Sequence, residues 1–265
     1  MRKEGVSELL YSVIQKLMKH QLFKDFLLGG GTNLAIKYNH RVSTDIDLFS
    51  TEIVGTKHLS EICDFFEDEF GKENITINKK NFGSEQLAHL AIFLKKEQIK
   101  IDIIQNLKLL YEPTTKNHIR LINDNDIGAL KLLAAADRGN QKDFYDLFLL
   151  TDIQPLSFYY KILRKRQETF SKDSDKNIFD IQNGKPIDDL KTSLTSLGDF
   201  SNAGDKKNPG NRIILTENSP IKIDWPILRK KWLERVEEFA KEAELKFKRT
   251  ELKRKLKGIY SKFRL

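Results

Sequence analysis

Two aspartates on a short apolar strand, shortly after a glycine turn, constrain the fold of this chain more than any other feature. Asp45 and Asp47 open the segment Asp45-Ile46-Asp47-Leu48-Phe49. Successive side chains of a strand point to opposite faces, so these two carboxylates must share a face. Two like charges held so close are costly unless a positive charge lies between them. A divalent metal ion is the usual solution.

The glycine turn lies just upstream, at Gly29-Gly30-Gly31, with Thr32 placed 13 residues before Asp45. Glycines let backbone N–H groups approach phosphate oxygens closely. A glycine cluster alone most often only makes a turn, and an isolated acid pair is common on protein surfaces. Their combination predicts metal-assisted chemistry on a nucleotide.

A third carboxylate strengthens this prediction. Asp102 lies within the strand-like segment Ile99–Gln105, in which Ile99, Ile101 and Ile103 would share the opposite face. A carboxylate in such an apolar strand is costly to bury without a partner. A metal ion shared with Asp45 and Asp47 would supply that partner. The alternative is an edge strand whose aspartate faces water.

The remaining pattern predicts an α/β (α+β) protein, with a mixed sheet and flanking helices followed by a helical bundle. Helical spacing and turn residues predict early helices at Val6–Phe26, Thr32–Tyr38 (capped by Thr32) and Thr56–Phe70. Strands are expected at Asp45–Ser50, Ile75–Asn81, Leu87–Leu94 and Ile99–Gln105, with an edge strand at His118–Ile122. Later helices are expected at Asp126–Arg138, Lys142–Leu150 and Leu156–Ser171, then a polar crossover over 172–218 and a long helix opened by Trp225-Pro226. We therefore expect two domains, 1–122 and 123–265.

Composition excludes several classes of protein. At 265 residues the chain can bury one large or two modest cores, and no apolar run approaches the ~20 residues that span a bilayer. The first residues lack the apolar core of a signal peptide. The single cysteine, Cys63, excludes an internal disulfide. We expect a cytoplasmic protein without a membrane partner.

The net charge of +8 is concentrated at the C-terminal end. Residues 227–265 hold 14 Lys and Arg against 6 Asp and Glu, so the preceding residues are balanced. The most basic part, 245–265, has apolar residues near helical spacing. Three interpretations remain open: a solvated amphipathic helix docked by its apolar stripe, a surface for a nucleic-acid backbone, or a membrane-surface helix.

Two blocks of sequence resemble the nucleotidyltransferase superfamily, in particular the AbiEii/AbiGii-like toxins of type IV abortive-infection systems. The first block runs from Gly30-Gly31-Thr32 to Arg41-x-Ser43-x-Asp45-Ile46-Asp47-Leu48-Phe49. The second contains Asp126, Lys131, Arg138-Gly139 and Lys142-Asp143-x-x-Asp146. The resemblance covers about Leu28 to Leu150, and it implies a nucleotidyltransferase fold.

The resemblance also implies roles for individual residues. Gly30, Gly31 and Thr32 would hold the phosphates of a nucleoside triphosphate. Asp45, Asp47 and Asp102 would ligate two divalent ions, Mg²⁺ or Mn²⁺, that clamp the attacking and leaving oxygens.

The second block adds charged side chains to this site. Lys131 and Arg138 are seven residues apart, so on one helix they share a face from which they could neutralise the leaving phosphates. Asp143 and Asp146, at i and i+3, could hold these cations or accept the acceptor's proton. The alternative for all four is an exposed helix surface. Arg41 and Ser43 are weaker candidates for base, ribose or phosphate contacts, and His40 receives no role.

The function that the resemblance implies is transfer of a nucleoside monophosphate from a triphosphate to an acceptor hydroxyl, with release of pyrophosphate. The acceptor would be RNA, tRNA in particular, and an antitoxin protein would be a partner. The alternative is an inactive module of the same fold that binds nucleotide or RNA. A phosphatase does not suit the residues around Asp45, and a glycosyltransferase would not need the glycine turn.

Overall fold

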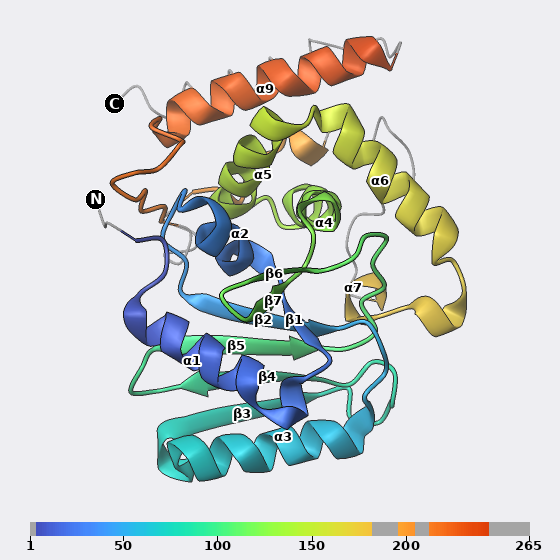
Figure 1. Ribbon diagram of the computed structural model, residues 1–265. Helices are drawn as coiled ribbons and strands as arrows, with labels where there is room; N and C mark the ends of the chain where they lie inside the picture. Colours follow the sequence, from blue (N-terminus) through green and yellow to red (C-terminus); the bar gives the residue numbers. More distant parts are fainter. Residues whose placement is uncertain (1–3, 182–195, 205–211, 244–265) are drawn as a thin grey trace.

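A computed structural model describes residues 4–181, 196–204 and 212–243. Its centre is a sheet of seven strands in the order β3-β4-β5-β2-β1-β7-β6 (Figure 1). The pairs β2/β5 and β1/β7 are parallel, and the other neighbours are antiparallel, so the sheet is mixed. The strands are β1 Phe26–Leu28, β2 Asp45–Ser50, β3 Ile75–Lys80, β4 His89–Leu94, β5 Ile99–Ile104, β6 Thr114–Lys116 and β7 Ile119–Leu121.

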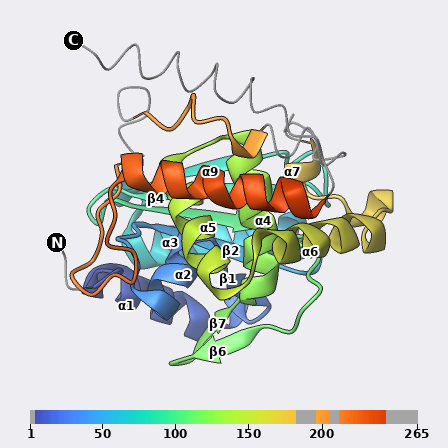
Figure 2. The same ribbon diagram turned by 90° about the horizontal axis from the view of Figure 1, so that it is seen from above.

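Helices cover both faces of the sheet. Helices α1 and α3 lie on one side, and α4, α5, α6 and α9 lie on the other (Figure 1). Viewed from above, α9 crosses α5 and α6 (Figure 2). The α-helices are α1 Glu8–Lys19, α2 Gly30–Tyr38, α3 Gly55–Phe70, α4 Asp124–Asp137, α5 Gln141–Ile153, α6 Leu156–Thr169, α7 Ile178–Ile181 and α9 Trp225–Glu242. Short 3₁₀ helices are η1 Gln21–Phe23, η2 Lys72–Asn74 and η3 Asp173–Asp175.

This architecture confirms the predicted fold class, a mixed sheet with flanking helices followed by helices. The two faces bury separate apolar cores. One joins the sheet to α1 and α3 around Phe23 and Phe66, and the other joins it to the later helices around Phe144 and Trp232. Each fully buried aromatic side chain of this kind contributes about 1.5–3 kcal/mol to folding. The second core also contains Phe49 and Ile104 of the sheet, so side chains from before and after residue 122 pack together. The domain boundary at residue 122 therefore stays a prediction.

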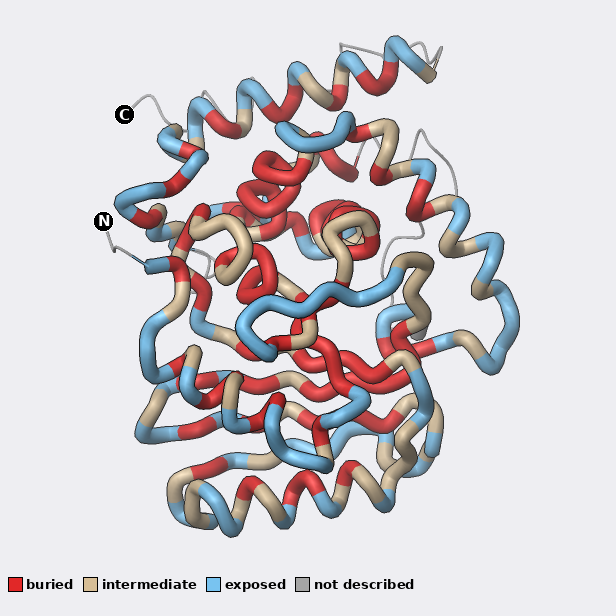
Figure 3. Tube along the Cα trace, viewed as in Figure 1, coloured by how far each residue is buried: buried red, intermediate tan, exposed pale blue. Residues whose placement is uncertain are grey.

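Helix α5 is buried on nearly every side (Figure 3). Its buried residues include not only Phe144 and Leu147 but also Asp143 and Asp146. An exposed helix surface, the alternative interpretation of those two acids, is therefore wrong. Charged side chains in such a helix need partners within the protein.

The sheet register brings the predicted acids together. Asp47 of β2 lies directly opposite Asp102 of β5, and β5 is an interior strand between β4 and β2. The edge-strand interpretation of Asp102 is therefore wrong. The predicted alternation of β5 is confirmed, since Ile99, Ile101 and Ile103 are buried on the opposite face.

Three local predictions are wrong. Thr32 is not the N-cap of α2, because the helix begins at Gly30 and Gly29 takes the cap position. Residues Phe26–Leu28 form β1, although the apolar spacing suggests a helix up to Phe26. Strand β7 is interior, because β6 pairs along its outer side and becomes the edge. The predicted start of the C-terminal helix at Trp225 is confirmed, with Asp224 as its N-cap.

The basic segment 245–265 lies outside the described residues. Within the described ranges, every helix is too short or too polar to cross a bilayer.

Candidate active site

The glycine turn leads directly from β1 into α2, and close contacts leave no room for a Cβ atom on any of its three glycines. Gly30 has a φ of 63°, a left-handed conformation that favours glycine. A Cβ atom on Gly30 would lie 1.9 Å from Oδ2 of Asp47, and one on Gly31 would lie 2.0 Å from Nη2 of Arg41. The turn therefore packs its backbone against the first acidic strand and against a buried arginine.

The three carboxylates of Asp45, Asp47 and Asp102 project from one face of adjacent strands β2 and β5. Burial, and then the negative charges of Asp102 and Asp45, raise the pKa of Asp47 to about 6. Lys100, also on β5, contacts Asp102 through an Nζ–Oδ2 distance of 2.6 Å. This face therefore concentrates negative charge that a single lysine offsets only in part.

The donor chemistry of this face suits a divalent cation. Carboxylate oxygens are the ligands that Mg²⁺ prefers, and the raised pKa of Asp47 shows that its own neighbours oppose its charge. In the described part of the chain, no three His, Cys, Asp or Glu side chains are already arranged as the ligands of one metal ion, so an ion bound here would have to draw these carboxylates together.

Thr32 and Ser43 tie the glycine turn to the start of β2. The Thr32 hydroxyl hydrogen-bonds the Ser43 hydroxyl, with 2.8 Å between the oxygens, and also the backbone carbonyl of Asp45. The Thr32 side chain is fully buried. These contacts favour a positioning role for both residues, in which they fix Asp45 relative to the turn.

A buried cluster of charges lies on α4 and α5. Lys131 Nζ lies 3.1 Å from Oδ1 of Asp143 and 2.6 Å from Oδ2 of Asp146. Arg138 donates two hydrogen bonds to Asp143, from Nε at 2.6 Å and from Nη2 at 2.8 Å. Lys131 and Arg138 thus meet at one carboxylate, as the spacing of seven residues predicts. Arg138 keeps about half of its side chain exposed, at 55 %.

Arg41 connects this cluster to the glycine turn. It is 2 % exposed, and it binds Asp146 in a bidentate manner, from Nε at 2.7 Å and from Nη2 at 2.8 Å. Bidentate guanidinium–carboxylate pairs are strong and fix geometry. Arg41 therefore places Gly31 against α5.

The cations paired with Asp143 and Asp146 lower the pKa of both carboxyls. Burial by itself raises the pKa of Asp146, but Arg41 and Lys131 outweigh it and hold that pKa well below its usual range. Lys131 and Arg138 likewise outweigh burial and lower the pKa of Asp143. A carboxylate with a lowered pKa is a weak base. The contacts thus favour the role in which Asp143 and Asp146 hold the cations.

His40 is a member of this site that the sequence analysis missed. Its Nε2 lies 2.7 Å from Oδ1 of Asp146, and its side chain is fully buried. Burial lowers the pKa of His40, so its imidazole is neutral and donates from Nε2 to the carboxylate. Its position next to Arg41 in the same loop is the only signal in the sequence.

Lys142 is a second residue without an assigned role. It is partly buried at the start of α5, and burial lowers its pKa while Asp45 acts in the opposite direction. Within the described residues it forms no ion pair, unlike Lys131 and Arg138. Its place beside Asp143 in the sequence block is the signal that could have identified it.

The comparison with known families is decisive. Residues 12–249 match the family described as nucleotidyl transferase AbiEii toxin, type IV TA system. The chain belongs to this family.

Individual relatives are more distant. An uncharacterized protein of Aquifex aeolicus is 28 % identical over 148 residues, which are 52 % of this chain and 63 % of that protein. The match thus spans less than two thirds of the relative's length. Among solved structures, the nucleotidyltransferase toxin MenT4 of Mycobacterium tuberculosis aligns with a TM-score of 0.48 at 13 % identity, over 86 % of this chain and 82 % of MenT4. JHP933 of Helicobacter pylori aligns with a TM-score of 0.41 at 16 % identity, over 90 % and 98 % of the two chains.

The structure brings the predicted site residues of this family member into one region. Asp47 faces Gly30 and Asp102, and Thr32 holds Asp45. Arg41 links Gly31 to the buried charges of α4 and α5. The positive charges of Lys131 and Arg138 act on Asp47 as well, where they lower its pKa.

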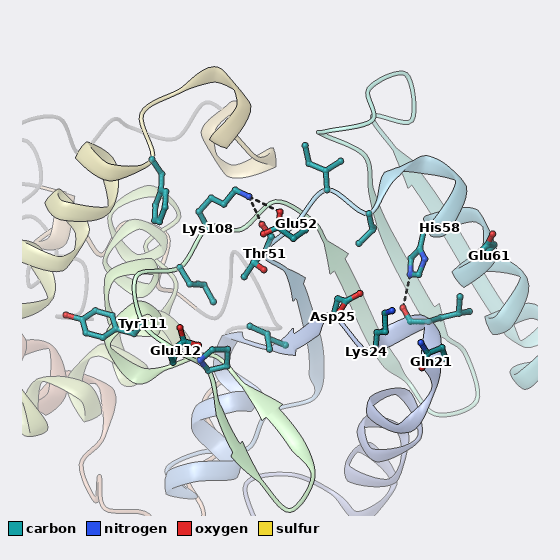
Figure 4. A pocket seen from close by; sticks show the side chains of 17 residues that line it. Gln21, Lys24, Asp25, Thr51, Glu52, His58, Glu61, Lys108, Tyr111 and Glu112 are labelled. Carbon is teal, nitrogen blue, oxygen red and sulfur yellow. Dashed lines mark hydrogen bonds and ion pairs between the residues drawn. The ribbon is translucent and has the colours of Figure 1, made fainter.

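A separate cavity of about 970 Å³ lies at the opposite end of β1 and β2 (Figure 4). Lys108 there donates to the carbonyl of Thr51 and pairs with Glu52, and His58 bonds the carbonyl of Leu22. None of the predicted site residues lines it. Its polar side chains are of mixed charge: Lys24, Asp25, Glu52, Glu61, Lys108 and Glu112.

Proposed function

We propose that this protein transfers a nucleoside monophosphate from a nucleoside triphosphate to an acceptor hydroxyl. The observation that carries the proposal is the placement of Asp45, Asp47 and Asp102 on one sheet face, with Asp47 packed against Gly30 of the glycine turn. In the reaction, the acceptor oxygen forms a bond to the α-phosphorus while the bond to the bridging oxygen breaks. The hydroxyl proton passes to a carboxylate of this face, and pyrophosphate leaves.

The turn and the neighbouring cations would bind the triphosphate. The first turn of α2 presents backbone N–H groups at a helix N-terminus, which favours anions. The carboxylates of Asp143 and Asp146 already pair with the three cations Arg41, Lys131 and Arg138. This cluster therefore keeps one net positive charge. Lys142 adds a further positive charge at its edge. These charges would stabilise the leaving pyrophosphate.

Asp45, Asp47 and Asp102 would hold divalent cations, Mg²⁺ or Mn²⁺. When bound, such ions stabilise negative charge on the attacking and leaving oxygens. Lys100 and its neighbour Asp102 would then adjust, because a cation competes with the lysine for the same oxygen. The protein's own contribution is to keep the three carboxylates on one rigid face.

The family supports a toxin role, and with it an antitoxin partner. We propose RNA, tRNA in particular, as the acceptor, and a cytoplasmic location follows from that choice. The basic excess of residues 227–265 is compatible with an RNA backbone.

The test incubates the purified protein with Mg²⁺, total RNA and each α-³²P-labelled nucleoside triphosphate in turn. The Asp45→Ala/Asp47→Ala double variant should lose the label that the wild type transfers. A matched control is Asp64→Ala/Asp68→Ala, which removes two exposed acids from α3 and should transfer normally.

Label in RNA from the wild type and the control, but not from Asp45→Ala/Asp47→Ala, would support the proposal. Label on protein alone would replace RNA by a protein acceptor. If no acceptor is labelled although triphosphate binds, the chain is a binding module and the proposed activity is refuted.

A further inference from the structure

The sheet face that carries the acids continues past them across β5, β4 and β3. The register places Asp102 opposite Ala91, and Ala91 opposite Asn78. It also places Lys100 opposite Phe93, and Phe93 opposite Thr76. Since cross-strand partners share a face, these rows extend directly from the acids to the edge of the sheet.

Most of this extension is exposed. Thr76, Asn78 and Lys80 of β3 are exposed, as is Lys100 of β5. Phe93 is 36 % exposed although β4 is an interior strand. The residues of the three strands on this face are Thr76, Asn78, Lys80, His89, Ala91, Phe93, Lys100, Asp102 and Ile104, of which His89 and Ile104 are buried. We call this set the β3–β5 face.

The chemistry of the β3–β5 face suits a single nucleic-acid strand. It presents one accessible aromatic ring among small polar side chains and two lysines, and its only carboxylate is Asp102 of the site. Aromatic rings on exposed sheets stack with unpaired bases, and nearby cations attract the phosphates. A protein partner would instead be expected to meet a larger apolar patch.

We propose that the β3–β5 face holds the single-stranded end of the RNA acceptor, with a base stacked on Phe93. This inference rests on the proposed function and names where its acceptor binds. Phe93 is the diagonal neighbour of Asp102, so their Cα atoms are about 7–8 Å apart. A base stacked there brings its ribose hydroxyl close to the acids.

Charge supports the same assignment. Lys100 pairs with Asp102 and lies next to Asp45 in the register, so it shields an approaching phosphate from the acids. Lys80, at the far end of β3, would contact the strand further from the reacting hydroxyl. The strand would therefore cross the sheet from the acids toward the edge strand β3.

The experiment measures binding of a fluorescein-labelled single-stranded RNA by anisotropy, without triphosphate, so that no transfer is needed. Phe93→Thr keeps a residue that favours strands but removes the ring, and it should weaken RNA binding at least about fivefold. Phe93→Tyr should restore binding. Lys80→Gln should reduce the slope of log affinity against log salt by about 1. Leu9→Ala, which truncates another exposed apolar side chain on α1, is the control and should bind as the wild type.

Triphosphate binding in Mg²⁺ is measured on the same proteins, and it should be unchanged in Phe93→Thr. Wild-type affinity of Phe93→Thr for RNA would overturn the inference, and so would a wild-type protein that does not bind RNA. RNA binding that depends on Phe93, in a protein that transfers no nucleotide, would support the RNA surface and refute the proposed activity instead.

Discussion

At the scale of single residues, Asp47 is placed where its surroundings oppose its charge. Burial and the carboxylates of Asp102 and Asp45 raise its pKa to about 6, so at neutral pH the ionised side chain destabilises the metal-free fold. One pKa unit corresponds to about 1.4 kcal/mol, and partial exposure reduces the sum. Asp47→Asn, assayed in EDTA at neutral pH, should therefore raise the free energy of unfolding by ~1–2 kcal/mol while it abolishes transfer.

Urea unfolding monitored by circular dichroism measures this change. Asp64→Asn, at an exposed site on α3, is the control and should stay within ~0.5 kcal/mol of the wild type. A less stable Asp47→Asn protein in EDTA would show that Asp47 is stabilised by its surroundings, contrary to the prediction.

Sequence patterns locate some residues of the site better than others. Asp45, Asp47 and Asp102 can be identified because a strand alternates and charged residues stand out in it. His40 and Lys142 cannot be assigned in this way, since their environment depends on the loop before β2 meeting α5. The burial of Asp143 likewise follows from packing around α5 on all sides, which no local spacing reveals.

At the scale of elements, a segment at the end of the polar crossover, residues 214–219, supports the site from outside. Leu215 pairs with Arg41 in an isolated bridge, and the N–H of Val42 donates to the carbonyl of Ile214 at 2.7 Å. Ser219 Oγ donates to the carbonyl of His40 at 2.5 Å. Residues 214–219 therefore hold the loop that carries His40 and Arg41, a contact between positions far apart in the sequence.

Removal of one hydroxyl tests this support. Ser219 is buried, so Ser219→Ala leaves the His40 carbonyl without that donor and should cost ~1–2 kcal/mol of unfolding free energy. Nucleotide transfer should also slow, because Arg41 is less well positioned. Ser201→Ala, at an exposed position of the same crossover, should leave both quantities unchanged. Equal stability and activity of Ser219→Ala would show that the segment gives no support.

The elements themselves differ in how far they can be predicted. Strand β2 and the long helices are predicted because their periodicity extends over several turns or alternations. Strand β1 has only three residues, all buried, and its apolar run continues the helical pattern before it. Strand β6 is entirely exposed, so it lacks the alternation of apolar and polar residues that predicts a strand. Without β6, the sequence cannot predict that β7 is an interior strand.

At the scale of the whole molecule, buried charges make stability depend on pH. The pKa values of Asp143 and Asp146 are lowered by their cations, so their stabilisation is present above the unfolded pKa near 4 and is lost as pH falls below it. Burial lowers the pKa of His40, so below about pH 6.5 the unfolded chain binds a proton that the fold excludes. Both effects reduce stability in acid.

Two carboxyls act in the opposite direction. Burial raises the pKa of Asp126, and burial with neighbouring acids raises that of Asp47 to about 6, so both favour the fold as pH falls. The Asp143 and Asp146 pairs involve full burial and several cations, and we expect them to prevail below pH 4, where the unfolded chain takes up the protons that they exclude. Between pH 4 and pH 2 the metal-free protein should therefore lose on the order of 2–3 kcal/mol of unfolding free energy.

Urea unfolding at a series of pH values measures this loss. A variant of His40 separates the contribution of the imidazole, which acts at higher pH than the two carboxyls. In His40→Asn, the decline between pH 7 and pH 5.5 should disappear, because no imidazole is left to take up a proton on unfolding. The decline below pH 4 should remain, since Asp146 keeps Arg41 and Lys131 as partners. A wild-type stability that is constant or rises between pH 4 and pH 2 would mean that Asp47 and Asp126, and not the buried pairs of Asp143 and Asp146, set the electrostatic balance of the fold.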